Sequence, residues 1–158
     1  MSNRAKSGDR TDGALGGGSP LETRPDDPGD AEAWVRLAEA HARTKNWAAA
    51  IADLSTAIAL SGEEPAHYFD RGRLNARVGA HRAAVADFSV GLELCERHGA
   101  YYYRDALRLF RAYCRVELNE RDAALQDLLL VPDDCQLWLN GLQSKMKLLE
   151  RCRSTEYP

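Results

Sequence analysis

The sequence lacks the features that mark membrane, secreted and metal-binding proteins. No apolar run approaches the ~20 residues that a membrane span needs, and no apolar signal core occurs near the first residue, so we expect a cytoplasmic protein. The four cysteines lie at least 17 residues apart, and the four histidines lack metal-ligand spacing. We therefore expect reduced thiols inside the fold, no metal site and no cofactor. A net charge of −3 provides no global basic field for nucleic acid or for an anionic membrane.

Catalytic motifs are also missing. The glycines at 16–18 follow no strand pattern and precede no lysine–serine pair, so they do not form a phosphate-binding loop. No G-x-S-x-G sequence occurs, and the histidines and cysteines show no nucleophile–base pattern. We predict that the chain is not an enzyme.

Residues 1–29 lack hydrophobic periodicity. They combine glycine, proline and charges of both signs, and such a stretch buries too little apolar area to offset its ordering entropy. We predict a disordered tail over 1–29, ahead of a folded domain over 30–153. A tail that carries a partner-binding motif is the alternative.

What the sequence does contain is an internal repeat, in which equivalent residues recur 34 positions apart. The matched pairs are Trp34 with Tyr68, Ala38 with Gly72, Ala50 with Ala84, Asp53 with Asp87, Leu54 with Phe88, and Leu60 with Leu94. A third copy follows at an offset of 40, with the pairs Arg71 and Arg111, Gly72 and Ala112, Ala84 and Ala124, Asp87 and Asp127, and Phe88 and Leu128. The larger offset places about six inserted residues between Cys95 and Tyr103.

A 34-residue helical hairpin with small residues where the helices cross resembles the tetratricopeptide repeat (TPR). The small crossing positions here are Ala38, Gly72 and Ala112. The third copy departs from the pattern at Arg108, where the family has a large apolar residue. The resemblance implies an all-α solenoid of three helix-turn-helix repeats, at about 31–64, 65–98 and 105–131.

A C-terminal capping helix is expected after these repeats. Pro132 stops the preceding helix, and we predict a helix over about 134–152. Its stripe of Trp138, Leu142, Lys145 or Met146, and Leu149, with Leu139 beside it, would cover the open apolar face of the last repeat. The alternative is that the stripe is offered to a partner chain or to a second copy.

Two arginine–aspartate pairs recur with the same spacing. Arg71 precedes Asp87 by 16 residues, and Arg111 precedes Asp127 by 16 residues. In a helical hairpin this spacing lets the guanidinium meet the carboxylate across the turn, which would set the register of the two helices. The alternative is that these are surface charges that happen to recur.

The TPR resemblance also implies a concave groove lined mainly by the first helix of each repeat. Aromatic and arginine side chains carry most of the energy of protein interfaces. We therefore expect Phe69, Arg73, Arg77 and Tyr113 to hold a peptide or helix of a partner protein, and a solvated arginine face without a ligand is the alternative. The remaining expected groove residues are Glu39, Arg43 and Leu109, and a possible second surface comprises Tyr101, Tyr102, Tyr103 and Trp138.

One variant of the family is not expected here. TPR co-chaperones that bind the acidic C-terminal tails of Hsp70 and Hsp90 use a clamp of basic residues and asparagine in this groove. The matching positions are Val35, Glu39, Asp70, Ala106 and Phe110. None is a clamp residue and two are acidic, so we predict no binding of such tails.

The sequence thus favours a protein–protein interaction adaptor or scaffold. One alternative is a dedicated bacterial chaperone or toxin-neutralising (immunity) partner, because arginine- and alanine-rich usage is typical of GC-rich bacterial genomes. A second is a homodimerising structural module built from the tyrosine stretch and the last helix. RNA binding by a helical repeat is disfavoured by the net charge.

Overall fold

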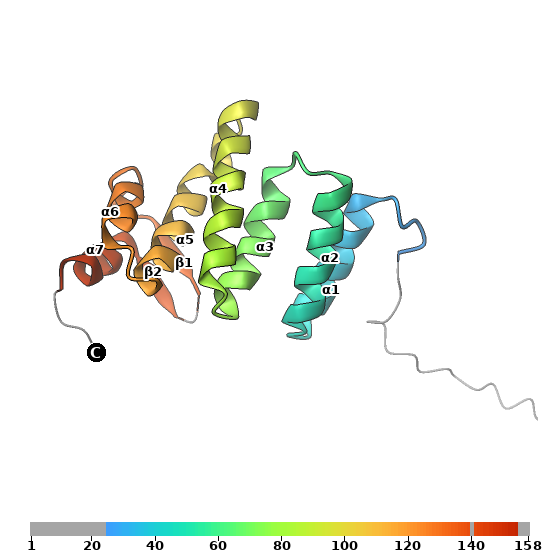
Figure 1. Cartoon of the computed structure of the whole chain (residues 1–158), viewed down its shortest axis with the longest axis horizontal. Coiled ribbons are helices and arrows are strands. Elements are labelled where there is room, and N and C mark those ends of the chain that lie inside the picture. The colour runs from blue at the N-terminus through green and yellow to red at the C-terminus, as the bar shows by residue number, and fades with distance from the viewer. Residues whose placement is uncertain (1–24, 140, 155–158) are drawn as a thin grey trace, which may run out of the picture.

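The computed structural model describes residues 25–139 and 141–154, and within them the protein is a row of helical hairpins (Figure 1). Repeat one is α1 (Ala31–Arg43) and α2 (Trp47–Leu60), repeat two is α3 (Pro65–Arg77) and α4 (His81–His98), and repeat three is α5 (Arg104–Glu117) and α6 (Arg121–Leu129). A short antiparallel pair, β1 (Gln136–Trp138) and β2 (Leu142–Ser144), precedes α7 (Lys145–Arg153). The expected all-α hairpin architecture is confirmed. Among the described residues, no helix is long and apolar enough to cross a membrane.

The helix boundaries follow local capping chemistry. Asp30 caps α1 by accepting a hydrogen bond from the backbone N–H of Glu32 at 2.9 Å. Pro65 occupies the first position of α3, where its missing donor is not needed. At the repeat-equivalent turn positions, Lys45, Gly79 and Asn119 all take positive φ values of 62°, 82° and 62°. Each of the three hairpin turns therefore has one residue in the left-handed backbone conformation, at the same position of the repeat.

The helices within a hairpin approach closely because the crossing residues are small. A Cβ atom added at Gly72 would lie 2.5 Å from the ring of Phe88, which is fully buried. Between neighbouring hairpins, a Cβ at Gly91 of α4 would lie 3.0 Å from the side chain of Leu107 of α5. Any larger residue at Gly72 would force the Phe88 ring or the helix to move.

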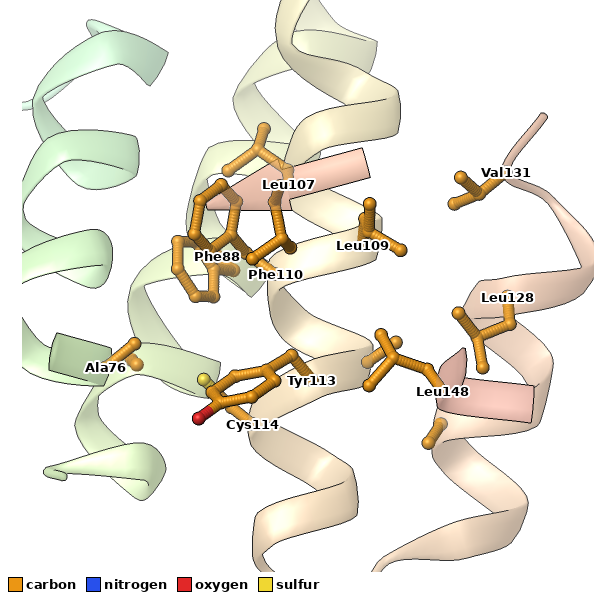
Figure 2. Packing of buried hydrophobic residues seen from close by; sticks show 14 of the residues in the cluster. Ala76, Phe88, Leu107, Leu109, Phe110, Tyr113, Cys114, Leu128, Val131 and Leu148 are labelled. Carbon is orange, nitrogen blue, oxygen red and sulfur yellow. The ribbon is translucent and has the colours of Figure 1, made fainter. Parts of the chain in front are cut away.

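The hydrophobic core divides into two unequal clusters. The larger runs from repeat two to α7 and includes Phe88, Leu107, Leu128 and Leu148 (Figure 2). The smaller belongs to repeat one, where the buried residues are Ala38, Ala50 and Leu54, with Val35, Ala42 and Leu74 packed against them at half burial. Repeat one is therefore joined to the rest of the solenoid through a thin apolar seam.

The insertion between repeats two and three lengthens one helix and adds a short one. Helix α4 continues to His98 and ends at Gly99, which has a φ of 67°. The three tyrosines form a 3-10 turn (Tyr101–Tyr103), and α5 begins at Arg104. From the sequence, Tyr101–Tyr103 would be expected to begin the fifth α-helix, and the structure shows that this expectation is wrong.

The predicted capping helix over 134–152 is wrong in its first half. Strands 136–138 and 142–144 form a β-hairpin with the pairs Gln136–Ser144, Leu137–Gln143 and Trp138–Leu142. Helix α7 begins only at Lys145 and is capped by Ser144, whose hydroxyl accepts from the Lys147 N–H at 3.2 Å. The predicted stripe is wrong at Trp138, Leu142 and Met146, which are exposed, whereas Leu139 and Lys145 are buried. The side chains that cover repeat three are Leu137, Leu139, Leu148 and Cys152.

The structure describes only the last five residues of the predicted tail over 1–29. Residues 1–24 lie outside the described residues. Residues 25–29 form a turn against α1, in which the indole N–H of Trp34 donates to the carbonyl of Pro28 at 2.9 Å. This last part of the predicted tail is therefore held by the folded domain.

Candidate partner-binding pocket

A buried carboxylate lies on the second helix of every repeat. Asp53, Asp87 and Asp127 are between 2% and 8% exposed. Arg71 reaches Asp87 with two nitrogens, Nη2 at 2.6 Å and Nε at 3.2 Å, and Arg111 reaches Asp127 at 2.6 and 2.9 Å. The predicted arginine–aspartate pairs are confirmed as two-pronged ion pairs across the hairpins of repeats two and three.

Each carboxylate also contacts a side chain late in the first helix of its own repeat, a contact that the sequence analysis did not predict. Late in each first helix, His41 lies 2.6 Å from Asp53, and Asn75 donates to Asp87 at 2.9 Å. In repeat three Arg115 donates to Asp127 at 2.7 Å. The sequence signal for these contacts was a polar residue at the same position in all three repeats.

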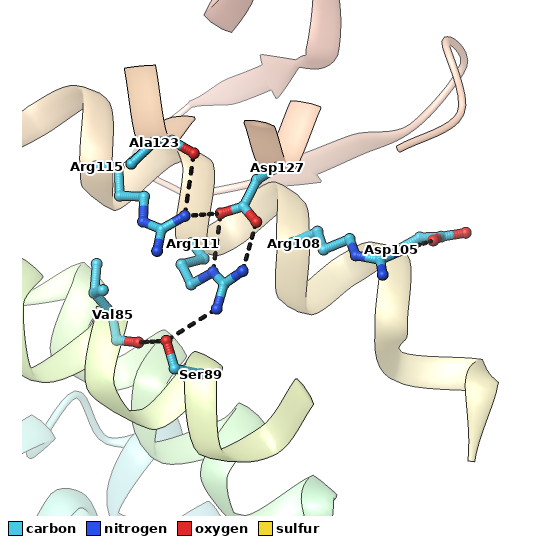
Figure 3. Close-up of polar contacts among 8 residues, drawn as sticks. All are labelled: Val85, Ser89, Asp105, Arg108, Arg111, Arg115, Ala123 and Asp127. Atoms are coloured by element: carbon cyan, nitrogen blue, oxygen red, sulfur yellow. Dashed lines mark hydrogen bonds and ion pairs between the residues drawn. The ribbon is translucent and has the colours of Figure 1, made fainter. Parts of the chain in front are cut away.

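The same arginines also join neighbouring repeats. Arg71 donates to the hydroxyl of Ser55 in repeat one at 3.1 Å. Arg111 donates to the hydroxyl of Ser89 in repeat two at 3.0 Å (Figure 3). We call these aspartates, arginines and serines the polar spine. Because each arginine bonds within its own hairpin and to the previous one, the polar spine sets the stacking of the repeats.

A pocket of about 590 Å³ opens between repeats one and two. Its apolar lining comes from Val35, Ala38, Ala42, Trp47, Leu54 and Leu74, and its charged lining from Glu39, Arg43, Asp70, Arg73 and Arg77. The apolar part includes most of the small repeat-one cluster. The pocket therefore exposes part of the small repeat-one cluster to solvent at the junction between repeats one and two.

Intramolecular contacts hold the arginines at the rim of this pocket. The Arg73 guanidinium lies 5.4 Å from the centre of the Phe69 ring and donates to Asp70 at 3.2 Å. The Arg77 guanidinium lies 5.3 Å from the centre of the Trp47 ring. Aromatic support of this kind restrains a charged side chain without neutralising it.

Asp70 is the acidic counterpart at the same rim. Burial raises the pKa of the Asp70 carboxyl, and the nearby Glu39 raises it further, whereas Arg73 acts in the opposite direction. The pocket thus has an apolar floor and a rim that carries both signs of charge.

The structure separates the seven predicted groove residues into three groups. Glu39, Arg43, Arg73 and Arg77 line the pocket. The Phe69 ring lies against the Arg73 guanidinium and packs against the rings of Phe88, Tyr103 and Phe110. The remaining two, Leu109 and Tyr113, are 1% and 7% exposed.

The expectation that Leu109 and Tyr113 face an open groove is therefore wrong. Both belong to the large core cluster together with Leu148 of α7 (Figure 2). Helix α7 is also tied to α5 by an ion pair between Arg151 and Glu117 at 2.8 Å. It occupies the place against α5 that a further repeat would take, so this part of the first-helix surface is interior.

Residues that the sequence did not indicate come from the neighbouring helices. Trp47 and Leu54 belong to α2, a second helix, and Leu74 is a half-buried residue of α3. No spacing rule distinguishes them from core residues. In the possible second surface, Tyr101, Tyr102 and Trp138 are exposed, while Tyr103 packs against Phe69.

No family model matches the sequence, and no curated protein matches it. Solved structures do match in fold. The TPR domain of OM64 from Arabidopsis superimposes with a TM-score of 0.64 at 18% identity, over 78% of this chain and 93% of that one. Two structures of MamA superimpose with TM-scores of 0.58 and 0.57 at 21% identity, over 79% of this chain. The match spans only 56% and 60% of those two chains. The chain has the fold of TPR domains.

The described residues offer no metal centre, since no group of three or more histidine, cysteine, aspartate or glutamate side chains is placed to hold an ion. All four cysteines are free.

Proposed function

We propose that the protein is an interaction module that binds a helix or extended segment of a partner protein in the pocket between repeats one and two. The observation that carries this proposal is the apolar floor under a rim of ring-supported arginines. A TPR-type fold supports it in general terms, because solenoids present extended binding surfaces.

The dimensions and chemistry of the pocket suit one large apolar side chain of a partner. Its volume of about 590 Å³ lies within the range of about 300–1,000 Å³ that is usual for ligand pockets. Burying a leucine or phenylalanine on Leu54, Leu74 and Val35 would contribute about 2 kcal/mol. The rim arginines Arg73 and Arg77 would then meet a carboxylate on the same partner segment.

The pocket does not suit a strongly acidic tail. Glu39 and Asp70 stand on its rim beside the arginines and would repel a run of carboxylates. We therefore keep the prediction that acidic C-terminal tails of Hsp70 and Hsp90 do not bind. A mixed, mainly apolar segment with one or two acidic residues is the partner chemistry that the rim favours.

The test is capture of partners from lysate with paired baits. The pocket variant carries Arg73→Glu and Arg77→Glu, and the matched control carries Arg82→Glu on the exposed side of α4. A partner that binds the wild type and the control but not the pocket variant supports the proposal. Partners retained equally by all three baits would contradict it, provided circular dichroism shows that each bait is folded.

The nature of the captured partner separates the remaining roles. A single abundant partner that is unstable alone favours a dedicated chaperone or immunity role, whereas several partners favour an adaptor or scaffold. A cytoplasmic location, a lack of nucleic-acid and membrane binding, and a lack of enzymatic activity stay predictions.

A further inference from the structure

Exposed hydrophobic side chains concentrate near the C-terminal end of the solenoid. Of the nine large hydrophobic residues that are exposed within the described chain, five lie between positions 129 and 146. They are Leu129, Leu130, Trp138, Leu142 and Met146. Exposed apolar side chains that gather on one part of a protein mark an interaction surface.

Two of them lie on the β-hairpin and a third lies in the first turn of α7. Trp138 and Leu142 are a cross-strand pair, so their side chains share the outer face of the hairpin, and they are 71% and 49% exposed. The ammonium of Lys147 donates to the carbonyl of Leu142 at 3.4 Å, which places the start of α7 against the hairpin. Met146, beside Lys147, is 59% exposed.

The outer side of α7 forms a hollow of about 570 Å³. It is lined by Met146, Lys147, Leu149, Glu150, Arg153 and Ser154. The opposite side of α7 buries Leu148 and Cys152 in the core. Neither Lys147 nor Glu150 has an ion pair among the described residues, so both charges are available to a partner.

The ends of the polar spine exclude one way of joining two copies. The position of Ser55 and Ser89 is occupied in repeat three by Leu129, and the position of Arg71 and Arg111 is occupied in repeat one by Leu37. A following copy therefore cannot stack on repeat three through the arginine–serine contact that joins the repeats. Self-association through the C-terminal end must therefore use a different arrangement.

We propose that a second copy of this chain docks on the outer side of α7 about a two-fold axis. With the two α7 helices antiparallel and the axis between residues 148 and 149, Lys147 of each copy lies opposite Glu150 of the other. Met146 and Leu149 fill the hollow of the facing copy. An isologous contact requires a patch that is complementary to itself. Here Lys147 and Glu150 meet this requirement, because the two-fold axis places each lysine opposite the glutamate of the other copy.

The charge pattern favours a second copy over an anionic membrane. A lipid surface would attract Lys147 and Arg153 but repel Glu150, which lies between them on the same lining. In the two-fold contact Glu150 is neutralised instead. The contact is independent of the pocket between repeats one and two, so either proposal can fail alone.

The experiment is light scattering coupled to size-exclusion chromatography, on the whole chain, across a concentration series. We expect the wild type to move from 17.5 kDa towards twice that mass as concentration rises. Lys147→Glu alone and Glu150→Lys alone each place like charges opposite each other twice, so each variant should remain monomeric where the wild type is dimeric. The double variant Lys147→Glu/Glu150→Lys should dimerise again.

Mixing provides the sharpest outcome. An equimolar mixture of the two single variants restores both opposite-charge pairs, so we expect a dimer from two proteins that are monomers alone. Both substitutions suit the helix dipole, since Lys147 is in the first turn of α7 and Glu150 is nearer its end. Because Lys147→Glu also removes the hydrogen bond to the Leu142 carbonyl, circular dichroism of each single variant must show that it is folded.

Three results would overturn the inference. The first is a wild type that stays at 17.5 kDa throughout the series. The second is a single variant that dimerises as the wild type does, with Arg82→Glu as the matched control. The third is a mixture of variants that remains monomeric. Binding of monomers to anionic phospholipid vesicles would assign the surface to a membrane instead.

Discussion

Asp127 is the aspartate of the polar spine that pairs with two arginines. It is 2% exposed and accepts hydrogen bonds from Arg111 and Arg115, both of which are largely shielded. Its two partners belong to the same helix, so one carboxylate fixes the register of repeat three. Removal of the Asp127 carboxylate would leave Arg111 and Arg115 as two shielded cations without a counter-charge.

We predict that Asp127→Ala lowers the free energy of unfolding by about 3 kcal/mol, because a shielded ion pair broken on one side leaves uncompensated charge. Urea denaturation followed by circular dichroism would measure it. The neighbouring exposed Gln126→Ala should change stability by less than about 0.5 kcal/mol. Equal losses for the two variants would contradict a structural role for the polar spine.

The cysteines differ in burial, and we predict a fixed order of thiol reactivity. Burial raises the pKa of the Cys114 thiol to about 12, with Glu117 adding to the effect, and burial also raises the pKa of Cys135, though this side chain is half-exposed. A raised thiol pKa means less thiolate at neutral pH, and the thiolate is the reactive form. Cys135 should therefore react first with a maleimide near pH 8, and Cys114 last. Rapid modification of Cys114 in the folded protein would contradict the packing of α5.

At the scale of elements, the three hairpin turns use one geometry with different residues. Lys45, Gly79 and Asn119 share a positive φ, which costs a residue with a side chain about 1–2 kcal/mol. Glycine avoids that cost, so the turn of repeat two is the least strained of the three. This difference allows two opposite substitutions to test one physical cause.

We predict that Gly79→Ala lowers the unfolding free energy by about 1 kcal/mol and that Lys45→Gly raises it by up to about 1 kcal/mol. A Cβ at Gly79 would meet nothing within 4 Å, so the expected loss arises from the backbone alone. Thermal unfolding would measure both changes. A stabilising Gly79→Ala, or a destabilising Lys45→Gly, would show that the turns do not retain this conformation.

At the scale of the whole molecule, the two core clusters imply unequal stability along the solenoid. Repeat one buries only two alanines and one leucine in its own cluster, whereas the cluster of repeats two and three continues into α7. The link between the two parts includes Arg71 with Ser55, and an approach of 3.6 Å between His67 and Glu32. Solenoids open where the interface between neighbours is weakest.

We predict that amide hydrogens of α1 and α2 exchange with solvent faster than those of α4 and α5 under native conditions. Hydrogen exchange read by mass spectrometry would resolve the two regions. Ser55→Ala, which removes the contact from Arg71, should widen the difference. If a partner binds the inter-repeat pocket, it should slow exchange in repeat one most, and uniform protection along the chain would contradict the two-cluster picture.

The repeat architecture was already determined by the sequence. A 34-residue spacing of small and large residues predicts helical hairpins because helix crossing requires small side chains, and Asp30, Pro65 and Gly99 mark boundaries through local backbone chemistry. The arginine–aspartate pairs followed for the same reason, since a fixed spacing across a turn brings the two groups together. These features depend on contacts within a hairpin.

The tertiary structure alone decided which apolar residues are covered. A helical stripe and a short β-hairpin compete for the same residues at 136–144, and burial of Leu137 and Leu139 in the core accompanies the hairpin and leaves Trp138 outside. The Asn140–Gly141 dipeptide was the sequence signal for a tight turn. Whether Tyr113 lines a groove or lies in the core depends on α7, which is distant in sequence. Burial is a property of neighbours brought together by folding, so periodicity within one helix cannot determine it.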